Sequence, residues 1–115
     1  DALERLLGDI LTRWDIRASG VIAHSDMAPG RKRDPGPRFD WRRLARSGLA
    51  VWPENVEPGR ARPDMAGFRA DAMAFGYPDV ADDLLLGAVR LRFRPSARGA
   101  LDATDCAIAA ALARA

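Results

Sequence analysis

The segment from His24 to Gly36 constrains the fold of this chain more than any other stretch. Its histidine directly follows the apolar run Val21-Ile22-Ala23, in which two residues are β-branched. This pattern is typical of a short buried strand, and the ligands of α/β proteins gather at the carboxyl ends of such strands. Residues 25–38 contain three prolines and no hydrophobic period, which predicts a loop. The sequence therefore predicts a strand that ends at a histidine and leads into a long loop.

Helical patterns lie on both sides of this segment. Apolar residues at helical spacing predict an amphipathic helix over residues 2–14. Asp40 can cap a second helix that Gly48 closes. We expect the tryptophans to be core or core-rim residues rather than substrate-stacking residues; they are Trp14, Trp41 and Trp52. Helices flanking a strand predict an α/β fold for this part of the chain.

The second half of the chain has a different pattern. Residues 53–63 contain three prolines and a glycine without apolar periodicity, which predicts a linker. Beyond them no strand is evident, and three short helices are predicted, the first ended by Gly76 and the third capped by Asp102 or Thr104. We expect the arginines of this half to form a solvated helix face. The single cysteine, Cys106, is expected to be a small buried apolar residue and can form no internal disulfide.

Composition and charge exclude several classes of function. Hydrophobic residues make up 48% of the chain and charged residues 30%, which is typical of a folded globular protein. The net charge is only +2 and the basic residues are scattered among acidic ones, which argues against a nucleic-acid partner. No apolar run approaches the roughly 20 residues of a membrane span, so no transmembrane segment is expected.

Two side chains of the loop could bind a metal. A neutral imidazole and a carboxylate, here His24 and Asp34, are both good zinc ligands at roughly 2.0–2.2 Å. Pro35 and Gly36 fit the central positions of a type II turn, which would hold Asp34 firmly. Asp26 is an alternative carboxylate, only two residues from His24. From these residues alone, a surface pair or a histidine satisfied in the core remains an alternative to a metal site.

Between these two residues lies Lys32, the only lysine in a chain with many arginines. In an extended segment, its side chain leaves on the same face as that of Asp34, two residues later. A compact ammonium group beside a metal-bound carbonyl could stabilise the oxyanion of a tetrahedral intermediate. The flanking Arg31 and Arg33 are candidate ligands for carboxylate or phosphate groups.

The loop motif resembles the C-terminal signature of the type 2, zinc-dependent N-acetylmuramoyl-L-alanine amidases over about residues 1–52. The residues that carry the resemblance are His24, Ser25, Asp26, Ala28, Pro29, Gly30, Arg31, Lys32, Asp34, Pro35, Gly36, Phe39 and Trp41. The resemblance implies that His24 is the second zinc histidine, Asp34 the third zinc ligand and Lys32 a residue that assists the transition state. It also implies the C-terminal part of an amidase-type mixed sheet with flanking helices.

Two functional parts of this family lie before the helix at the start of this chain, namely the first zinc histidine and a catalytic acidic or tyrosine residue. His24 is the only histidine here. We therefore expect the chain to be the C-terminal portion of an amidase catalytic domain. The 115 residues alone are expected to bind zinc poorly and to be inactive.

The second half resembles the three-helix peptidoglycan-binding domains that follow such amidases. The residues in question are Phe75-Gly76-Tyr77, Ala88-Val89, Leu91, Phe93-Arg94-Pro95, Gly99, Leu101-Asp102, Ile108 and Leu112. The glutamine that usually follows the phenylalanine is absent. The predicted organisation is an α/β amidase part over residues 1–52, a linker over 53–63 and a small all-α three-helix domain over 64–115.

The two resemblances together imply hydrolysis of the amide bond between N-acetylmuramic acid and L-alanine in peptidoglycan, with Zn²⁺ as cofactor. Arg31 and Arg33 would meet the carboxylates of the stem peptide. The expected partner is peptidoglycan or a muropeptide. The alternative is a non-catalytic module that recognises muropeptides without cutting them. A wall-binding module favours the bacterial cell envelope or periplasm, although cytoplasmic members of the family also exist.

Overall fold

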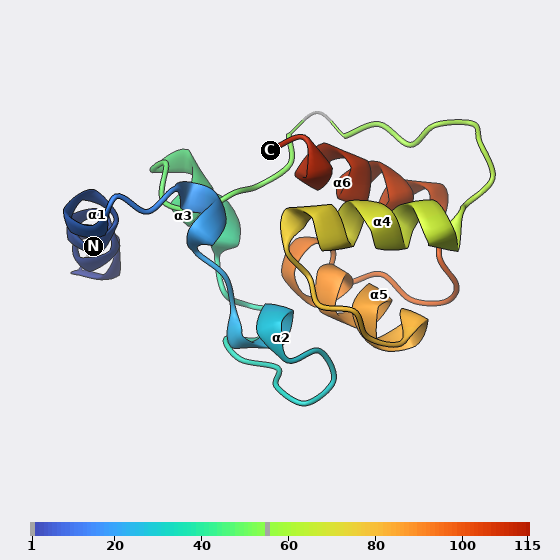
Figure 1. Ribbon diagram of the computed structural model, residues 1–115, viewed down its shortest axis with the longest axis horizontal. Helices are drawn as coiled ribbons and strands as arrows, with labels where there is room; N and C mark the ends of the chain where they lie inside the picture. Colours follow the sequence, from blue (N-terminus) through green and yellow to red (C-terminus); the bar gives the residue numbers. More distant parts are fainter. Residues whose placement is uncertain (1, 55) are drawn as a thin grey trace.

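The computed structural model describes residues 2–54 and 56–115, and all regular structure in them is helical (Figure 1). The elements in chain order are α1 (Ala2–Trp14), the 3₁₀ turn η1 (Ala18–Gly20), α2 (His24–Met27), α3 (Trp41–Arg46), α4 (Met65–Phe75), α5 (Asp82–Phe93) and α6 (Ala103–Ala113). The short helices α2 and α3 lie between α1 and the group formed by α4, α5 and α6 (Figure 1). None of these helices is long and apolar enough to cross a membrane.

The predicted α/β fold with a mixed sheet is wrong, because residues 2–54 and 56–115 contain no strand. Residues 21–23 have no regular structure, and His24 begins helix α2 instead of ending a strand. A strand requires a neighbouring strand that pairs with its backbone groups. Here side chains take that place: Asp26 accepts from the Ala23 N–H at 2.9 Å, and Arg92 donates to the Val21 carbonyl at 3.3 Å.

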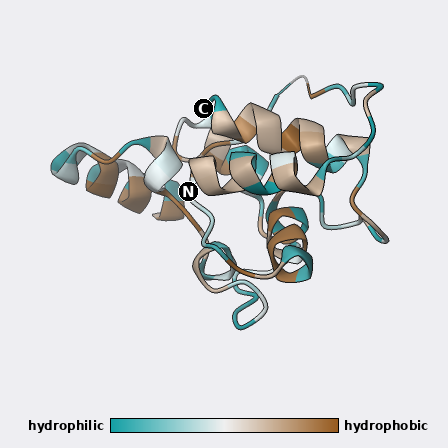
Figure 2. Ribbon diagram, turned by 45° about the vertical axis from the view of Figure 1, so that its right-hand side comes forward, coloured by the Kyte–Doolittle hydropathy of each residue, from teal (hydrophilic) through white to brown (hydrophobic). Residues whose placement is uncertain are grey.

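Helix α1 forms as its hydrophobic period predicts, but it stays exposed. None of its residues is buried, and its exposed apolar side chains include Leu3, Leu6, Ile10 and Trp14. Figure 2 shows hydrophobic residues along α1, which lies to one side of α4, α5 and α6. The prediction of Trp14 as a core residue is wrong, since it is 71% exposed. An ion pair of 2.7 Å between Glu4 and Arg43 links α1 to α3.

Helices α3, α4 and α6 confirm the predicted caps. Asp40 accepts a hydrogen bond from the Arg43 N–H at 3.0 Å. Gly76 follows the last residue of α4 with a φ of 132°, a left-handed conformation that glycine adopts readily. Of the two alternatives for α6, Asp102 is the cap, because it accepts from the Asp105 N–H at 2.9 Å.

The largest core lies among α4, α5 and α6, with α4 packed chiefly against α6. Its largest fully buried apolar side chains are Phe68, Leu85, Val89 and Leu112. Cys106 is only partly buried, at the edge of this core. A smaller core around Trp41 and Leu44 belongs to the first half of the chain, and Trp52 packs against both. The division at residues 53–63 stays a prediction.

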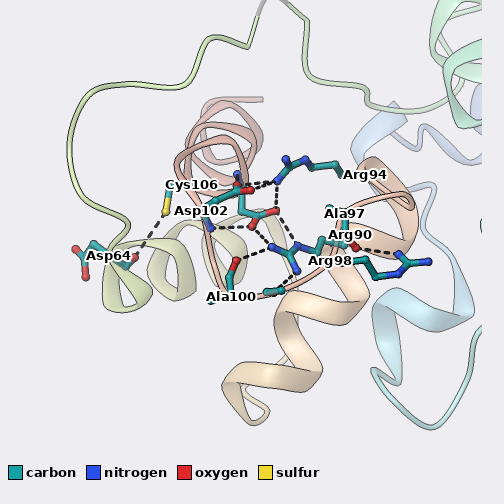
Figure 3. A network of polar contacts seen from close by, with 10 residues as sticks. Asp64, Arg90, Arg94, Ala97, Arg98, Ala100, Asp102 and Cys106 are labelled. Carbon is teal, nitrogen blue, oxygen red and sulfur yellow. Dashed lines mark hydrogen bonds and ion pairs between the residues drawn. The ribbon is translucent and has the colours of Figure 1, made fainter.

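A polar network fixes the connection between α5 and α6 (Figure 3). The buried Asp105 pairs with Arg90 at 2.6 Å and with Arg94 at 3.0 Å. Arg90 also donates to the carbonyl groups of Gly99 and Ala100 at 2.7 and 2.9 Å. These arginines are therefore structural, and the prediction of a solvated arginine face is wrong for them.

The carboxyl group of Asp102 belongs to the same network (Figure 3). Arg94 donates to its two oxygens at 2.6 and 2.8 Å. This hydrogen-bonded guanidinium lowers the pKa of Asp102 from 3.8 to about 2. Because the folded protein holds the ionised form, the pair stabilises the fold above about pH 4.

A second buried pair joins the two halves of the chain. Arg92 of α5, whose side chain is 0% exposed, pairs with Asp26 of α2 at 2.8 Å. The Arg92 guanidinium also lies over the ring of Trp41, 4.1 Å from its centroid. Tyr77, after α4, donates its hydroxyl to the other oxygen of Asp26 at 2.6 Å. Helix α2 is thereby held on the three-helix part of the molecule.

The variant Asp102→Asn tests the pH dependence of stability. Asparagine keeps the side-chain oxygen that caps α6 but loses the charge. We expect the variant to be less stable than the parent at pH 7, and the difference to disappear as the pH falls from about 4 to about 2, through the folded pKa of Asp102. Urea unfolding at several pH values measures this. Glu57→Gln, at an exposed carboxylate that pairs with no described residue, is the control. A difference that persists to pH 2 would contradict the expectation.

The variant Arg92→Met tests the buried pair. It leaves the Asp26 carboxylate uncompensated in the interior, so we expect the free energy of unfolding to fall by about 3–5 kcal/mol. Adding Asp26→Asn should recover part of this loss, because the charge without a partner is then gone. Urea denaturation of the parent, both single variants and the double variant gives the coupling; additive losses would show that the two side chains do not interact.

Candidate functional site

The structure brings His24 and Asp34 together. His24 is the first residue of α2, and Asp34 lies ten positions later, in the loop between α2 and α3. The loop folds back so that the Ser25 N–H donates to the Asp34 carbonyl at 3.2 Å. The His24 Nδ1 and the Asp34 Oδ2 are 3.2 Å apart, and their side chains are 54% and 65% exposed. The two predicted ligands therefore share one accessible point on the surface.

This geometry can be tested against the requirements of a zinc ion. Two ligand atoms at roughly 2.0–2.2 Å from a tetrahedral zinc lie roughly 3.3–3.6 Å apart. The observed 3.2 Å is close to that separation, and it also suits a direct hydrogen bond between imidazole and carboxylate. The described part of the chain contains no cluster of three such ligand residues. His24 and Asp34 thus fit two positions of a catalytic zinc site, which usually has three protein ligands.

The basic residues of the loop lie beside this pair in sequence and face solvent. Arg31, Lys32 and Arg33 are all exposed, and none forms an ion pair with a described residue. The N–H groups of Arg31 and Lys32 both donate to the Ala28 carbonyl, at 3.1 and 3.0 Å, which closes a turn. Lys32 and Arg33 line a hollow of about 220 Å³ between the loop and α5. Their charges are therefore available to an anionic ligand.

The loop also rests on the second half of the chain at Gly30. This residue has a φ of 76°, and a Cβ atom built on it would lie 2.6 Å from the Leu84 Cδ2 of α5. Gly36, after Pro35, has a φ of 93°, a left-handed conformation that glycine adopts readily. The turn itself lies at Asp34 and Pro35, so the predicted type II turn with Pro35 and Gly36 at its centre is wrong. The two glycines let the loop turn sharply while staying close to α5.

Asp26, the alternative metal ligand, has a different role. It is 5% exposed and accepts hydrogen bonds from the Ala23 N–H at 2.9 Å, Tyr77 at 2.6 Å and Arg92 at 2.8 Å. Burial, together with the negative charge of Asp26, raises the pKa of Tyr77 well above its usual value, so the phenol stays a donor. These contacts occupy Asp26, and they favour Asp34 as the carboxylate of the candidate site.

Sequence reasoning missed this supporting network. A carboxylate three residues after Ala23 is a usual helix-capping position, so the spacing of Asp26 could have indicated its role. No local signal distinguishes the buried Arg92 from the exposed arginines, because its partners lie 66 and 71 positions earlier in the chain, at Asp26 and Val21.

Comparison with known proteins gives relatives of one kind. No family model matches the chain. N-acetylmuramoyl-L-alanine amidase AmiD of Escherichia coli K12 is 38% identical over 127 residues, which cover 96% of this chain and 46% of AmiD. The 1,6-anhydro-N-acetylmuramyl-L-alanine amidase AmpD of Enterobacter cloacae is 50% identical over 35 residues, 30% of this chain and 19% of AmpD.

Solved structures agree with these relatives. The E. coli AmiD complex with anhydro-N-acetylmuramic acid-L-Ala-D-γ-Glu-L-Lys superimposes with a TM-score of 0.84 at 37% identity, covering 98% of this chain and 50% of AmiD. AmpDh3 from Pseudomonas aeruginosa gives a TM-score of 0.80 at 34% identity, over 98% of this chain and 51% of AmpDh3.

The comparisons thus give relatives of one class, the N-acetylmuramoyl-L-alanine amidases. The chain is similar to AmiD over 96% of its length and to AmpD over 30%. It spans about half the length of AmiD and AmpDh3.

Proposed function

We propose that the protein carrying this chain is a zinc-dependent amidase that hydrolyses the bond between N-acetylmuramic acid and L-alanine in peptidoglycan. The observation that carries the proposal is the 3.2 Å approach of His24 Nδ1 and Asp34 Oδ2, in a chain 38% identical to AmiD over 96% of its length. The substrate class is supported by the relatives: AmiD was solved with a muramyl tripeptide and AmpDh3 with an anhydromuramic pentapeptide.

His24 and Asp34 are the residues that would hold the metal, through Nδ1 and a carboxylate oxygen. Bound zinc would polarise the scissile carbonyl and lower the pKa of its water, to about 7 in the best cases. The resemblance implies that another histidine and the general base lie outside these 115 residues. Both His24 and Asp34 are exposed, so a substrate carbonyl can reach the point where they meet.

Lys32 is the residue that would stabilise the oxyanion. Its exposure and its lack of an ion pair with any residue described here leave its ammonium group available. A positive charge placed where negative charge develops stabilises the transition state more than the ground state. Arg31 and Arg33, also exposed, would bind the carboxylates of the stem peptide. A peptidoglycan substrate favours the cell envelope or periplasm, with the cytoplasm as the alternative for released muropeptides.

Zinc binding tests the metal ligands directly. In the full-length protein, His24→Ala and Asp34→Ala should each reduce bound zinc from an equimolar amount to a trace, because each removes a side chain that binds the metal directly. Metal analysis after dialysis against zinc measures this. Glu57→Ala removes an exposed carboxylate elsewhere on the chain and should retain full occupancy. Equal zinc content in all variants would place the metal elsewhere.

Hydrolysis of a soluble anhydromuropeptide tests Lys32. We expect Lys32→Ala to lower kcat by about 10²–10³-fold with a nearly unchanged KM, because the charge acts mainly in the transition state. Arg38→Ala, which removes another exposed positive charge later in the same loop, is the control. An unchanged kcat would refute the role of Lys32. A full-length protein that binds zinc and muropeptide but leaves the amide intact would favour the recognition module instead.

A further inference from the structure

We propose that Tyr77 and Arg92 are positioning residues for His24, so that the three-helix part belongs to the structure of the active site. The inference rests on the proposed function of His24 as a zinc ligand. It differs from the expectation of an appended domain that only binds the cell wall. The contacts of α2 carry the argument.

Helix α2 needs support from outside itself. It contains four residues, from His24 to Met27, and a single helical turn is not stable alone. Its support is the Asp26 carboxylate, which accepts from the Ala23 N–H at 2.9 Å and so fixes the backbone immediately before His24. The direction of the His24 side chain therefore depends on where Asp26 is held.

Two residues of the second half of the chain hold the Asp26 carboxylate in position. Tyr77 donates to Oδ1 at 2.6 Å and Arg92 donates to Oδ2 at 2.8 Å, and all three side chains are buried. Two donors on two oxygens fix both the position and the rotation of a carboxylate. Hydrogen bonds to an ionised group are also shorter and stronger than neutral ones.

Arg92 itself is held rigidly and contacts the chain on both sides of His24. Its guanidinium donates to the Val21 carbonyl at 3.3 Å, before His24, and to Asp26, after it. A further donation reaches the Val51 carbonyl at 3.4 Å. The aromatic ring of Trp41, 4.1 Å away, covers the cation. One side chain of α5 thus contacts the backbone before the candidate ligand and the Asp26 side chain after it.

The chemistry of this contact differs from that of a movable domain interface. Interfaces between domains that move are usually hydrated and resemble transient protein contacts. Here Arg92 of the second half, with 0% side-chain exposure, is buried against Asp26 of the first half. Its Nε has no hydrogen-bond partner among the described residues. Burial of a charge is costly and gives little net stability. Its benefit here is a single orientation of α2, which a metal ligand requires.

The experiment uses Tyr77→Phe in the full-length protein, which removes one hydroxyl and preserves the ring. We expect zinc affinity, measured by competition with a chelator, to weaken about tenfold, as for other residues that orient metal ligands. On a soluble anhydromuropeptide, kcat should fall by a similar factor while KM stays unchanged. In the zinc-free protein, amide hydrogen exchange should accelerate at Ala23 and Asp26.

Ile108→Val is the matched control, because Ile108 lies in the same core and does not touch Asp26. It should lower the melting temperature without changing zinc affinity, kcat or α2 exchange. Arg92→Lys keeps the charge but loses the planar guanidinium, so it should show the defects of Tyr77→Phe.

Three outcomes would overturn the inference. If Tyr77→Phe leaves zinc affinity and kcat unchanged, as Ile108→Val does, the positioning role is refuted and the proposed function is unaffected. A defect of Tyr77→Phe on intact cell wall alone would assign Tyr77 to wall binding. Absence of both zinc binding and hydrolysis in the unmodified protein would refute the proposed function, and this inference with it.

Discussion

The ion pair between Arg92 and Asp26 is the interaction on which the arrangement of the two halves depends. Each charge would be unfavourable at its position without the other, because neither side chain reaches water. Asp26 therefore requires the three-helix part to be in place, and Arg92 requires the segment around His24. This mutual requirement makes the loop geometry a property of the whole chain, although the loop residues themselves are close in sequence.

The features predicted correctly from sequence are those with local causes. Asp102, whose carboxylate accepts from the Asp105 N–H, caps α6, and Gly76 follows the last residue of α4. The strand expected before His24 does not form, because a strand depends on backbone pairing with another segment of the chain, which a local pattern does not reveal. Val21-Ile22-Ala23 has the composition of a strand, yet its backbone groups bond to the side chains of Asp26 and Arg92. Of this run only Ala23 is buried, and Ile22 is 44% exposed, so the predicted burial of the segment is wrong as well as its predicted conformation.

The candidate site also contains residues that the sequence identifies and residues that it does not. His24 and Asp34 could be found from sequence because their chemistry and their rigid turn lie within thirteen residues, and they are 3.2 Å apart in the structure. Asp26 was a competing ligand on sequence grounds, since residue type alone does not show whether a carboxylate is exposed or buried. Arg92 was grouped with solvated arginines for the same reason. Residues that act through long-range contacts carry no pattern of their own.

Exposure and rigidity impose opposite demands on this site. In their proposed role as zinc ligands, His24 and Asp34 have to be accessible to a substrate amide, and both are more than half exposed. Exposed loop residues have few contacts that fix their direction. Metal-ligand geometry nevertheless tolerates only small errors. The chain meets both demands by placing the proposed ligands at the surface and their support, Asp26 with Tyr77 and Arg92, in the interior. If the loop and the three-helix part moved independently, this support would be lost, and for this reason we propose that the two act as one unit.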